Sequence, residues 1–533
     1  MTKDNFDKVF DVVGHAGRYQ YILYMCTGIV GIITGWTLTN PNFLLVTPNY
    51  RCKVENKDYS NTNFSASYFS LKKSTDKCVN QTLVNPCDQC ESYEFDTSDK
   101  DTNYVNSFSV EYELICDKKK KKTLMKQTWF LGTMIGALFL SYIIDNHGRK
   151  AGIFVGELLR LVANLLIAFS HDLTLSIWYR VLVAAGFEIC YKSAYIYAVE
   201  IVGTKKRAMF GMAFIFFYSC GYATLSGVAY IFQDWRHLII FVGVASVVPM
   251  GIMFVIPESP RYSYAQKKYD EAEKALKTIA EKNGNNPDLV DINEIINLDS
   301  ENKNNNESSE KQVYTALDLF TNGKRMMYVL IICIISWSGA NLLYYGVTLN
   351  AAGLPFNIYV SNLCYALAEW PAAVAGVYVI EMKKLGRVRA MALVYGLCGV
   401  CLVLGSLSQK YAGCETSFDN FFVTASIIFK LFGKCLATLC FTCAFMVCAE
   451  MFPTIVRGNA MAVCSLMSRI AGAMAPEIIE LGETMPLLPG FILGGVGIFC
   501  GVLILALPET RGQAMLMTFK QADEFYKKKL FKF

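Results

Sequence analysis

Charged side chains stand within long apolar stretches of this chain, where a charge needs a partner or a ligand. Arg469, Glu369 and Lys434 lie in three different stretches of the C-terminal part. Lys192 lies in the N-terminal part, four residues after Glu188, which is the favourable order for a pair along a helix. An ionised group is costly in apolar surroundings, so each residue predicts an internal ion pair or a site for a charged ligand.

Arg469 and Glu369 offer opposite chemistries to a ligand. A guanidinium binds a carboxylate or sulfate through two parallel hydrogen bonds, and its alternative role is an ion pair with Glu369 or Glu477. The Glu369 carboxylate is suited to an ammonium group. Together the two residues suit a zwitterion, or an anion with a polar cationic part. For Lys192 we expect pairing with Glu188, and ligand contact stays the alternative.

Aromatic side chains in the same stretches are candidates for lining a cavity. Rings stack on organic ligands, and their faces attract cations. Because 13% of the residues are aromatic, most of them are expected to be core or membrane-interface residues. The predicted ligand-binding set is Arg469, Glu369, Tyr345, Tyr344, Lys434, Phe441, Tyr195 and Lys192.

The elements that position these residues have the length of membrane spans. A helix that crosses a bilayer needs about 20 mostly apolar residues. Of the 533 residues, 53% are hydrophobic and only 18% are charged, against about 25% charged in soluble domains. Soluble core helices would also be shorter and amphipathic. Twelve spans are predicted, near 20–46, 124–144, 151–169, 173–201, 208–232, 238–256, 326–348, 356–380, 387–408, 421–449, 458–480 and 487–507.

A repeated motif divides these spans into two groups of six. Three patterns recur: Gly148-Arg149 as Gly386-Arg387, Glu200-x-x-x-Thr204-x-x-Arg207 as Glu450-x-x-x-Thr454-x-x-Arg457, and Pro257-Glu258-Ser259-x-Arg261 as Pro508-Glu509-Thr510-Arg511. A parallel duplication of this kind is typical of transporters whose halves rock around a site near the midplane. The predicted fold class is therefore an all-α membrane protein with twelve transmembrane helices in two six-helix halves.

The repeated charges lie at helix ends, where they are suited to gating. Pairs of this kind form when two halves close and separate when they open, which biases one state of a bistable element. The alternative is that they only anchor the topology. The predicted gating set is Asp145, Arg149, Glu200, Arg207, Glu258, Arg261, Arg387, Glu450, Arg457, Glu509 and Arg511.

The distribution of basic residues predicts the orientation. Lysine and arginine collect in short cytoplasmic loops, which here places both termini inside. Lys118 to Lys122 disagree, but they belong to a long loop, where the rule is weak. The net charge of +5 follows from this bias and needs no nucleic-acid partner. The predicted parts are a cytoplasmic N-terminus (1–19), a first half (20–256) with a large extracellular loop (47–123), a cytoplasmic linker (257–325), a second half (326–507) and a cytoplasmic tail (508–533).

The large loop carries features of an oxidising compartment. Cysteines in such a place are expected to form disulfides. Two sequons for glycosylation, at Asn63 and Asn80, lie on the same loop. Cys87 and Cys90 have the spacing of zinc ligands, but no histidine is near, so no metal site is predicted. The disulfide candidates are Cys52, Cys78, Cys87, Cys90 and Cys116, with Cys414 of another outer loop as the sixth.

Several motifs resemble a known family. The run from Asp145 to Lys150, Asp-Asn-His-Gly-Arg-Lys, resembles a signature of the major facilitator superfamily. Pro257-Glu258-Ser259-Pro260-Arg261 and Glu450-Met-Phe-Pro453-Thr454-x-x-Arg457 are similar to motifs of its organic cation, anion and zwitterion transporters (solute carrier family 22). The resemblance covers nearly the whole chain. The second loop signature departs from the pattern, with Lys383 where an acid is usual.

The resemblance implies a plasma-membrane transporter that moves small organic ions by alternating access. It also implies that the position of Arg469 separates subfamilies, with an acid in cation transporters and an arginine in anion and zwitterion transporters. Organic anions or carnitine-like zwitterions are therefore the favoured substrates. An organic cation transporter, or a non-transporting receptor or sensor on the same scaffold, stays the alternative.

No enzyme is predicted. The sequence lacks nucleotide-binding, zinc-protease and nucleophile-elbow motifs, and its four histidines lie at or outside span ends. No cofactor is expected. The expected partners are a small organic ion and the lipid bilayer, and the oligomeric state stays open.

Overall fold

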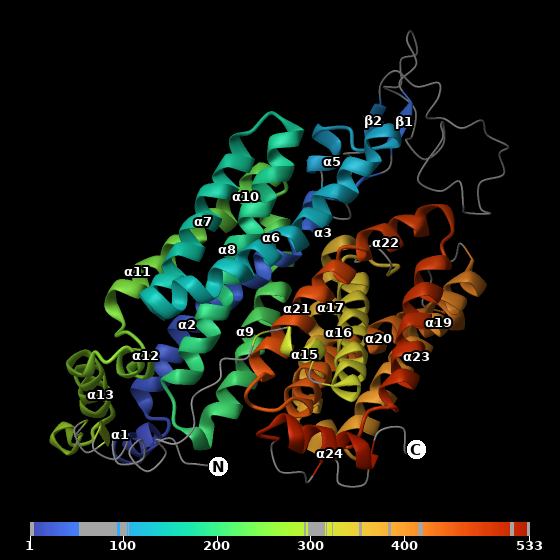
Figure 1. Ribbon diagram of the computed structural model, residues 1–533. Coiled ribbons are helices and arrows are strands. Elements are labelled where there is room, and N and C mark those ends of the chain that lie inside the picture. The colour runs from blue at the N-terminus through green and yellow to red at the C-terminus, as the bar shows by residue number, and fades with distance from the viewer. Residues whose placement is uncertain are drawn as a thin grey trace. The chain divides into compact units, whose positions relative to one another are not determined.

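The computed structural model describes most of the chain, and almost all of the described part is helical (Figure 1). The described residues are 5–48, 50–52, 93–95, 104, 106–290, 292, 295–296, 315, 317–321, 323–350, 354–381, 385–413, 419–511 and 516–529. One small antiparallel sheet pairs β1 (Tyr50–Cys52) with β2 (Tyr93–Phe95), and Arg51 lies opposite Glu94.

The helices before residue 257 are α1 (Val9–Val13), α2 (Arg18–Thr39), α3 (Pro41–Leu44), α5 (Phe108–Glu111), α6 (Lys119–His147), α7 (Arg149–Phe169), α8 (Leu173–Glu200), α9 (Thr204–Ile231), α10 (Trp235–Ala245) and α11 (Val247–Val255). Between the two groups of spans lie α12 (Pro260–Ala265), α13 (Tyr269–Asn283) and α15 (Asp318–Thr321). The later helices are α16 (Lys324–Thr348), α17 (Ile358–Leu367), α18 (Glu369–Glu381), α19 (Arg387–Ala412), α20 (Phe421–Met451), α21 (Arg457–Gly472), α22 (Ala475–Thr484), α23 (Leu488–Ile504) and α24 (Phe519–Lys529). Short 3₁₀ turns are η1 (Asn5–Lys8), η4 (Cys116–Lys118) and η5 (Pro287–Leu289).

The predicted spans coincide with these helices. Within the described residues, ten helical segments are long and apolar enough to cross a membrane. Leu488–Ile504 is a shorter apolar helix at the last predicted span, and α17 with α18 covers the one at 356–380. The prediction of an all-α membrane protein is confirmed.

Three spans break in the same way, because each contains a proline. Proline has no N–H, and its ring clashes with the carbonyl four residues earlier, so a helix ends there. α10 ends at Ala245, α17 at Leu367 and α21 at Gly472. In each case a proline follows four residues later, at Pro249, Pro371 and Pro476.

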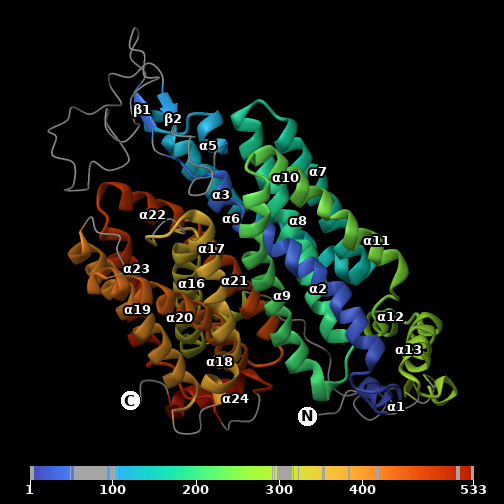
Figure 2. The same ribbon diagram turned by 180° about the vertical axis from the view of Figure 1, so that it is seen from behind.

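The contacts divide the chain into two compact units. Unit 1 comprises Met1–Leu38, Gly132–Gly221 and Ile239–Val313, and unit 2 comprises Thr39–Leu131, Tyr222–Leu238 and Tyr314–Phe533. In unit 1, α7 and α8 run side by side, and in unit 2, α19 packs along α20 and α23 (Figures 1 and 2). Unit 2 therefore contains segments from before and after the predicted linker.

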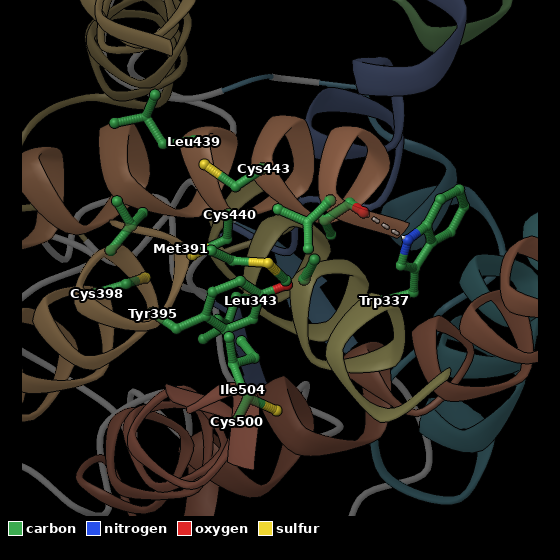
Figure 3. Close-up of a cluster of buried hydrophobic side chains, with 14 of the residues drawn as sticks. Trp337, Leu343, Met391, Tyr395, Cys398, Leu439, Cys440, Cys443, Cys500 and Ile504 are labelled. Atoms are coloured by element: carbon green, nitrogen blue, oxygen red, sulfur yellow. Dashed lines mark hydrogen bonds between the residues drawn. The ribbon is translucent and has the colours of Figure 1, made fainter. Parts of the chain in front are cut away.

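The core of unit 2 is built from aromatic, aliphatic and cysteine side chains of α16, α19, α20 and α23. Figure 3 shows Trp337 with its indole nitrogen directed at a backbone oxygen, and this Nε1–H donates to the Ala444 carbonyl at 3.0 Å. Tyr395 is fully buried nearby, and its hydroxyl donates to the Ser336 carbonyl at 2.7 Å. These bonds satisfy the polar ends of two large side chains, which fixes α16 against α19 and α20.

Candidate functional site

A buried ion pair joins two of the predicted ligand-binding residues in unit 2. The Nζ atom of Lys434, on α20, lies 2.8 Å from Oε1 of Glu369, and their side chains are 0% and 1% exposed. Lys434 also donates to the hydroxyl of Thr348 at 2.6 Å, and the Tyr344 hydroxyl donates to the same Glu369 oxygen at 2.8 Å. Removing one partner of a buried ion pair leaves an uncompensated charge, which costs about 3–5 kcal/mol.

The break between α17 and α18 places Glu369 at this position. Pro371 prevents the two helices from continuing as one, so Glu369 becomes the first residue of α18. The first turn of a helix carries partial positive charge, which favours a carboxylate. Glu369 is therefore held by the helix terminus, by Lys434 and by Tyr344.

Two aromatic rings lie next to the ammonium group of Lys434. Its Nζ lies 3.8 Å from the ring centroid of Tyr344 and 5.7 Å from that of Tyr222. Phe441 contacts Tyr344 with ring centroids 6.2 Å apart, and Tyr345 is in edge-to-face contact with Tyr344 at 5.3 Å. The structure thus brings together five of the eight predicted residues: Glu369, Lys434, Tyr344, Tyr345 and Phe441.

Thr348 and Tyr222 also belong to this cluster, and the sequence analysis missed both. Neither is charged, and Tyr222 lies in α9, far from the other members in sequence. A threonine at the end of an apolar run carries no signal of its own.

Arg469 lies on the last turn of α21 in the same unit and is partly buried. The two acids considered as its internal partners also bond other residues of unit 2. Glu369 is bonded to Lys434 and Tyr344, and Glu477 accepts from Gln127 Nε2 at 3.0 Å.

Two other predicted residues, Lys192 and Tyr195, lie in unit 1. Lys192 Nζ is 2.5 Å from Glu188 Oε1, so it forms the ion pair that its spacing predicted. Tyr195 packs against Phe214 of α9, with ring centroids 5.9 Å apart. Lys192 is thus paired with Glu188 of the same helix, α8.

The first copy of the repeated motif is a tight cluster of charges in unit 1. The Arg149 guanidinium donates from Nε and Nη2 to the two carboxylate oxygens of Glu200, at 2.9 and 2.8 Å. Ser259 Oγ donates to Glu200 as well, at 2.5 Å. Glu258 accepts from the backbone N–H groups of Arg149 and Lys150, at 3.2 and 3.3 Å, and so caps α7.

Because Gly148 has no side chain, the Glu258 carboxylate can approach the backbone at the start of α7. Its φ is +98°, a backbone conformation that favours glycine, and a Cβ at this position would lie 2.4 Å from Glu258 Oε2. Burial raises the pKa of the Glu258 carboxyl, and the backbone N–H groups of Ser259, Lys150 and Arg149 oppose that shift.

The second copy repeats this geometry in unit 2. Arg387 bonds Glu450 through Nη1, and Glu509 accepts from the backbone N–H of Arg387 at 2.8 Å and of Val388 at 3.2 Å. Gly386 has a φ of +79°, and a Cβ there would lie 2.4 Å from Glu509 Oε2. The motif is therefore duplicated in three dimensions as well as in sequence.

Asp7 completes the first copy, and the sequence analysis missed it. Its carboxylate accepts from Arg207 Nη2 at 3.0 Å and from Arg261 Nη2. The Arg261 guanidinium also lies over the rings of Phe6 and Phe10, at 5.3 and 5.5 Å. An aspartate in a short polar N-terminal segment gave no sign of this contact.

Three other predicted gating residues each take part in a hydrogen bond that involves a backbone group. Asp145 is exposed, and its backbone carbonyl accepts from Gln266 Nε2 at 2.6 Å. Arg457 Nε donates to the Phe452 carbonyl at 3.3 Å. The backbone N–H of Arg511 donates to Glu509 at 3.1 Å.

A family model described as sugar (and other) transporter matches residues 59–521, most of the chain. The chain belongs to the sugar (and other) transporter family. Organic cation transporter 1 of Caenorhabditis elegans is similar, with 26% identity over 98% of this chain and 89% of that protein. Human organic cation/carnitine transporter 2 is also 26% identical, over 97% of this chain and 94% of that protein. The resemblance to the organic cation, anion and zwitterion transporters is thus confirmed.

The fold has known representatives within the major facilitator superfamily. The xylose transporter XylE of E. coli, in an inward-open conformation, aligns with a TM-score of 0.61 over 95% of this chain and 99% of that one. The sequences are 13% identical, so this likeness concerns the fold alone. The family match and the similar transporters make this chain a multi-pass membrane transporter of organic ions and not an enzyme.

Unit 1 of this transporter holds a second fully buried ion pair, at which Glu157 and Arg160 meet one turn apart on α7. Both are 0% exposed. Arg160 Nε donates to Ser246 Oγ at 3.2 Å, and Nη1 donates to Thr34 Oγ1 at 3.3 Å. Ser246 is the residue between α10 and α11, so the proline break supplies a hydroxyl for a buried arginine. The pair ties α2 and α7 to that break.

Most of the disulfide and glycosylation candidates lie outside the described residues. These are Cys78, Cys87, Cys90, Asn63 and Asn80 of the loop predicted at 47–123, together with Cys414 and the side chain of Cys52. Cys116 is described and is disulfide-bonded. Thirteen of the described cysteines, in or beside the helices, are not part of a disulfide.

Proposed function

We propose that this transporter moves organic anions or zwitterions, carnitine-like zwitterions above all, across the plasma membrane by alternating access, with both termini cytoplasmic. The observation that carries the proposal is the buried pair of Lys434 and Glu369, whose side chains are 0% and 1% exposed. Such a pair presents one cationic and one anionic group at a single place.

Charge balance favours a zwitterion at this pair. A cation that took Glu369 would leave the Lys434 ammonium uncompensated, and an anion that took Lys434 would leave the Glu369 carboxylate uncompensated. Either outcome buries an unpaired charge, which is costly. A zwitterion exchanges partners with both groups at once and leaves no charge unpaired.

The surroundings of the pair suit the two ends of such a ligand. A quaternary ammonium group cannot donate a hydrogen bond, but it binds the faces of aromatic rings, and the Tyr344 and Tyr222 rings lie 3.8 and 5.7 Å from Lys434 Nζ. The Tyr222 hydroxyl is buried and has no hydrogen-bond partner within the described part of the chain. A ligand carboxylate would satisfy it, and Arg469 on α21 supplies a further cationic group.

Uptake of three radiolabelled probes tests the proposal: L-carnitine as zwitterion, p-aminohippurate as anion and tetraethylammonium as cation. Cells that express the chain should accumulate carnitine or aminohippurate. Arg469→Asp should abolish both, whereas Arg469→Lys keeps the charge and should retain part. Glu369→Gln should reduce carnitine uptake more than aminohippurate uptake.

The outcomes separate the alternatives. Accumulation of tetraethylammonium alone would make the chain a cation transporter. No uptake of any probe by protein present at the cell surface, as measured by surface biotinylation, would favour a receptor or sensor. Carboxylate uptake that Arg469→Asp leaves unchanged would contradict the role of Arg469.

A further inference from the structure

Asn362, on α17 of the second repeat, is a fully buried amide that bonds residues of the first repeat within unit 2. Its Nδ2 donates to Ser226 Oγ at 3.0 Å and to the Tyr222 carbonyl at 3.3 Å, both on α9. Its Oδ1 accepts from Asn42 Nδ2, on α3, at 3.0 Å. α3 and α9 precede the linker in sequence and α17 follows it, so one side chain joins elements of the two repeats.

Asn42 connects this amide pair to the end of α16. Asn42 is 8% exposed, and its Nδ2 also donates to the Thr348 carbonyl at 3.2 Å. The Thr348 hydroxyl in turn accepts from Lys434 Nζ at 2.6 Å and donates to the Tyr344 carbonyl at 2.6 Å. Thr348 is thus bonded through its carbonyl to the amide pair and through its hydroxyl to the Lys434–Glu369 pair.

We propose that Asn42, Asn362 and Ser226 form a polar latch that closes one end of the transport path, and that Thr348 couples the latch to the Lys434–Glu369 pair. The proposal rests on the proposed function, whose topology makes the latch extracellular. Asn42 and Thr348 are positioning residues: they act through Lys434 and through the closure of the helix ends.

The physical chemistry of buried amides supports this role. A buried amide that loses its partners pays the cost of desolvation, so the latch stays bonded while the helix ends are packed. When the helix ends separate, hydrogen bonds to water replace those of the latch. The free-energy difference between the closed and the open state then becomes small. A ligand that binds Lys434 removes a donor from the Thr348 hydroxyl. It thereby shifts the equilibrium between the closed and the open latch.

Labelling of a cysteine at Ser226 with a membrane-impermeant methanethiosulfonate reagent, applied from outside, tests the latch. The Ser226→Cys thiol keeps a weak acceptor next to Asn362. Each variant is also made with Ser226 unchanged, and the labelling of that protein, which comes from the native cysteines, is subtracted. Adding Asn362→Ala, which removes three hydrogen bonds, or Asn42→Ala, which removes two, should raise the labelling rate roughly tenfold.

Asn357→Ala is the matched control. Asn357 is an asparagine of the same helix, but its side chain caps α17 by accepting from the Val360 N–H at 2.8 Å. This control should change the rate less than twofold. Equal rates in the Asn362 and Asn357 variants, or labelling only after the cells are permeabilised, would overturn the proposal.

A double-mutant cycle tests the coupling without any ligand. Thr348→Val should raise the Ser226→Cys labelling rate about threefold, and so should the paired change Lys434→Met with Glu369→Gln, which leaves no orphan charge. Thr348→Val combined with the paired change should give the same labelling rate as either change alone. Thr348→Ser, which keeps the hydroxyl, should label at the original rate. Rates that multiply would refute the coupling.

The two proposals fail in different ways. Labelling needs no transported substrate, so a latch that responds as expected while no probe is taken up would refute the proposed function alone. Normal carnitine uptake with labelling that ignores Asn362 would refute the latch alone. Surface biotinylation of each variant verifies that it folds and reaches the membrane.

Discussion

The two copies of the repeated motif share their backbone geometry but differ in how their charges are satisfied. In unit 1, Glu200 accepts from two nitrogens of Arg149 and from Ser259. In unit 2, Arg387 reaches Glu450 through one nitrogen. There, Arg387 Nε, Glu450 Oε2 and Thr510 Oγ1 make no hydrogen bond within the described residues.

The difference teaches that a duplicated sequence motif need not contribute equally in both places. The Arg149 and Glu200 side chains are 14% and 15% exposed, against 26% and 22% for Arg387 and Glu450. More exposed ion pairs are weaker, because water screens them. The first copy also recruits Asp7, so it anchors the N-terminal segment. We infer that the first copy is the rigid one and the second the more adaptable.

The largest expected contrast is between Arg149→Ala and Arg387→Ala. Arg149→Ala removes a bidentate ion pair, a bond to the Ile144 carbonyl and a contact over the Tyr262 ring. We expect Arg149→Ala to lower the free energy of unfolding by about 2 kcal/mol and Arg387→Ala to lower it by about 0.5–1 kcal/mol. Both values are below those of fully buried pairs, because the side chains are partly exposed. Melting temperatures of the purified proteins in detergent, together with initial uptake rates, measure the contrast.

The double variant Arg149→Glu with Glu200→Arg provides the control, because it reverses the pair without deleting it. It should recover part of the melting temperature that Arg149→Glu alone loses. If Arg387→Ala proves the more harmful of the two alanine variants, the assignment of the rigid copy is wrong.

Asp7→Asn should have a smaller effect that is confined to the first copy. It removes the charge between Arg207 and Arg261 but keeps a side chain of the same size, so we expect a loss of about 1 kcal/mol. The rings of Phe6 and Phe10 still hold Arg261. Limited proteolysis measures how firmly the N-terminal segment is held. The cleavage rate of Asp7→Asn is compared with that of the wild type and of Asp11→Asn, the control. Unchanged cleavage would show that Asp7 does not anchor the segment.

The sequence predicted the spans and the repeated motif because both are properties of a one-dimensional pattern. Run length identified the helices, and recurring charges such as Glu200 and Glu450 identified the duplicated ends. It also predicted Glu369 and Lys434 as members of one site, because a charge in an apolar run is conspicuous. Their direct pairing did not follow, because nothing in the spacing shows which of several charges meet.

Neutral polar residues were the ones that sequence reasoning missed. Thr348 and Asn42 look ordinary near the ends of predicted spans, and Asn362 looks ordinary within one. Their bonds join residues as far apart as Asn42 and Asn362. Asp7 is charged, but it was missed because its arginine partners lie about 200 and 250 residues away. Long-range hydrogen bonds between neutral groups leave no periodic trace, so only the folded structure reveals them.

The smallest contrast, and the sharpest, is between Ser259→Ala and Thr510→Val, which occupy equivalent places in the two copies. Ser259 Oγ donates to Glu200 and accepts from the Tyr262 N–H at 3.3 Å, as an N-cap of α12. Losing both bonds should cost about 1 kcal/mol. The Thr510 hydroxyl makes no such bond to the described residues, and valine keeps its shape, so Thr510→Val should leave the melting temperature unchanged within error. Equal losses would mean that the second copy is as tightly bonded as the first, and the distinction between a rigid and an adaptable copy would fall.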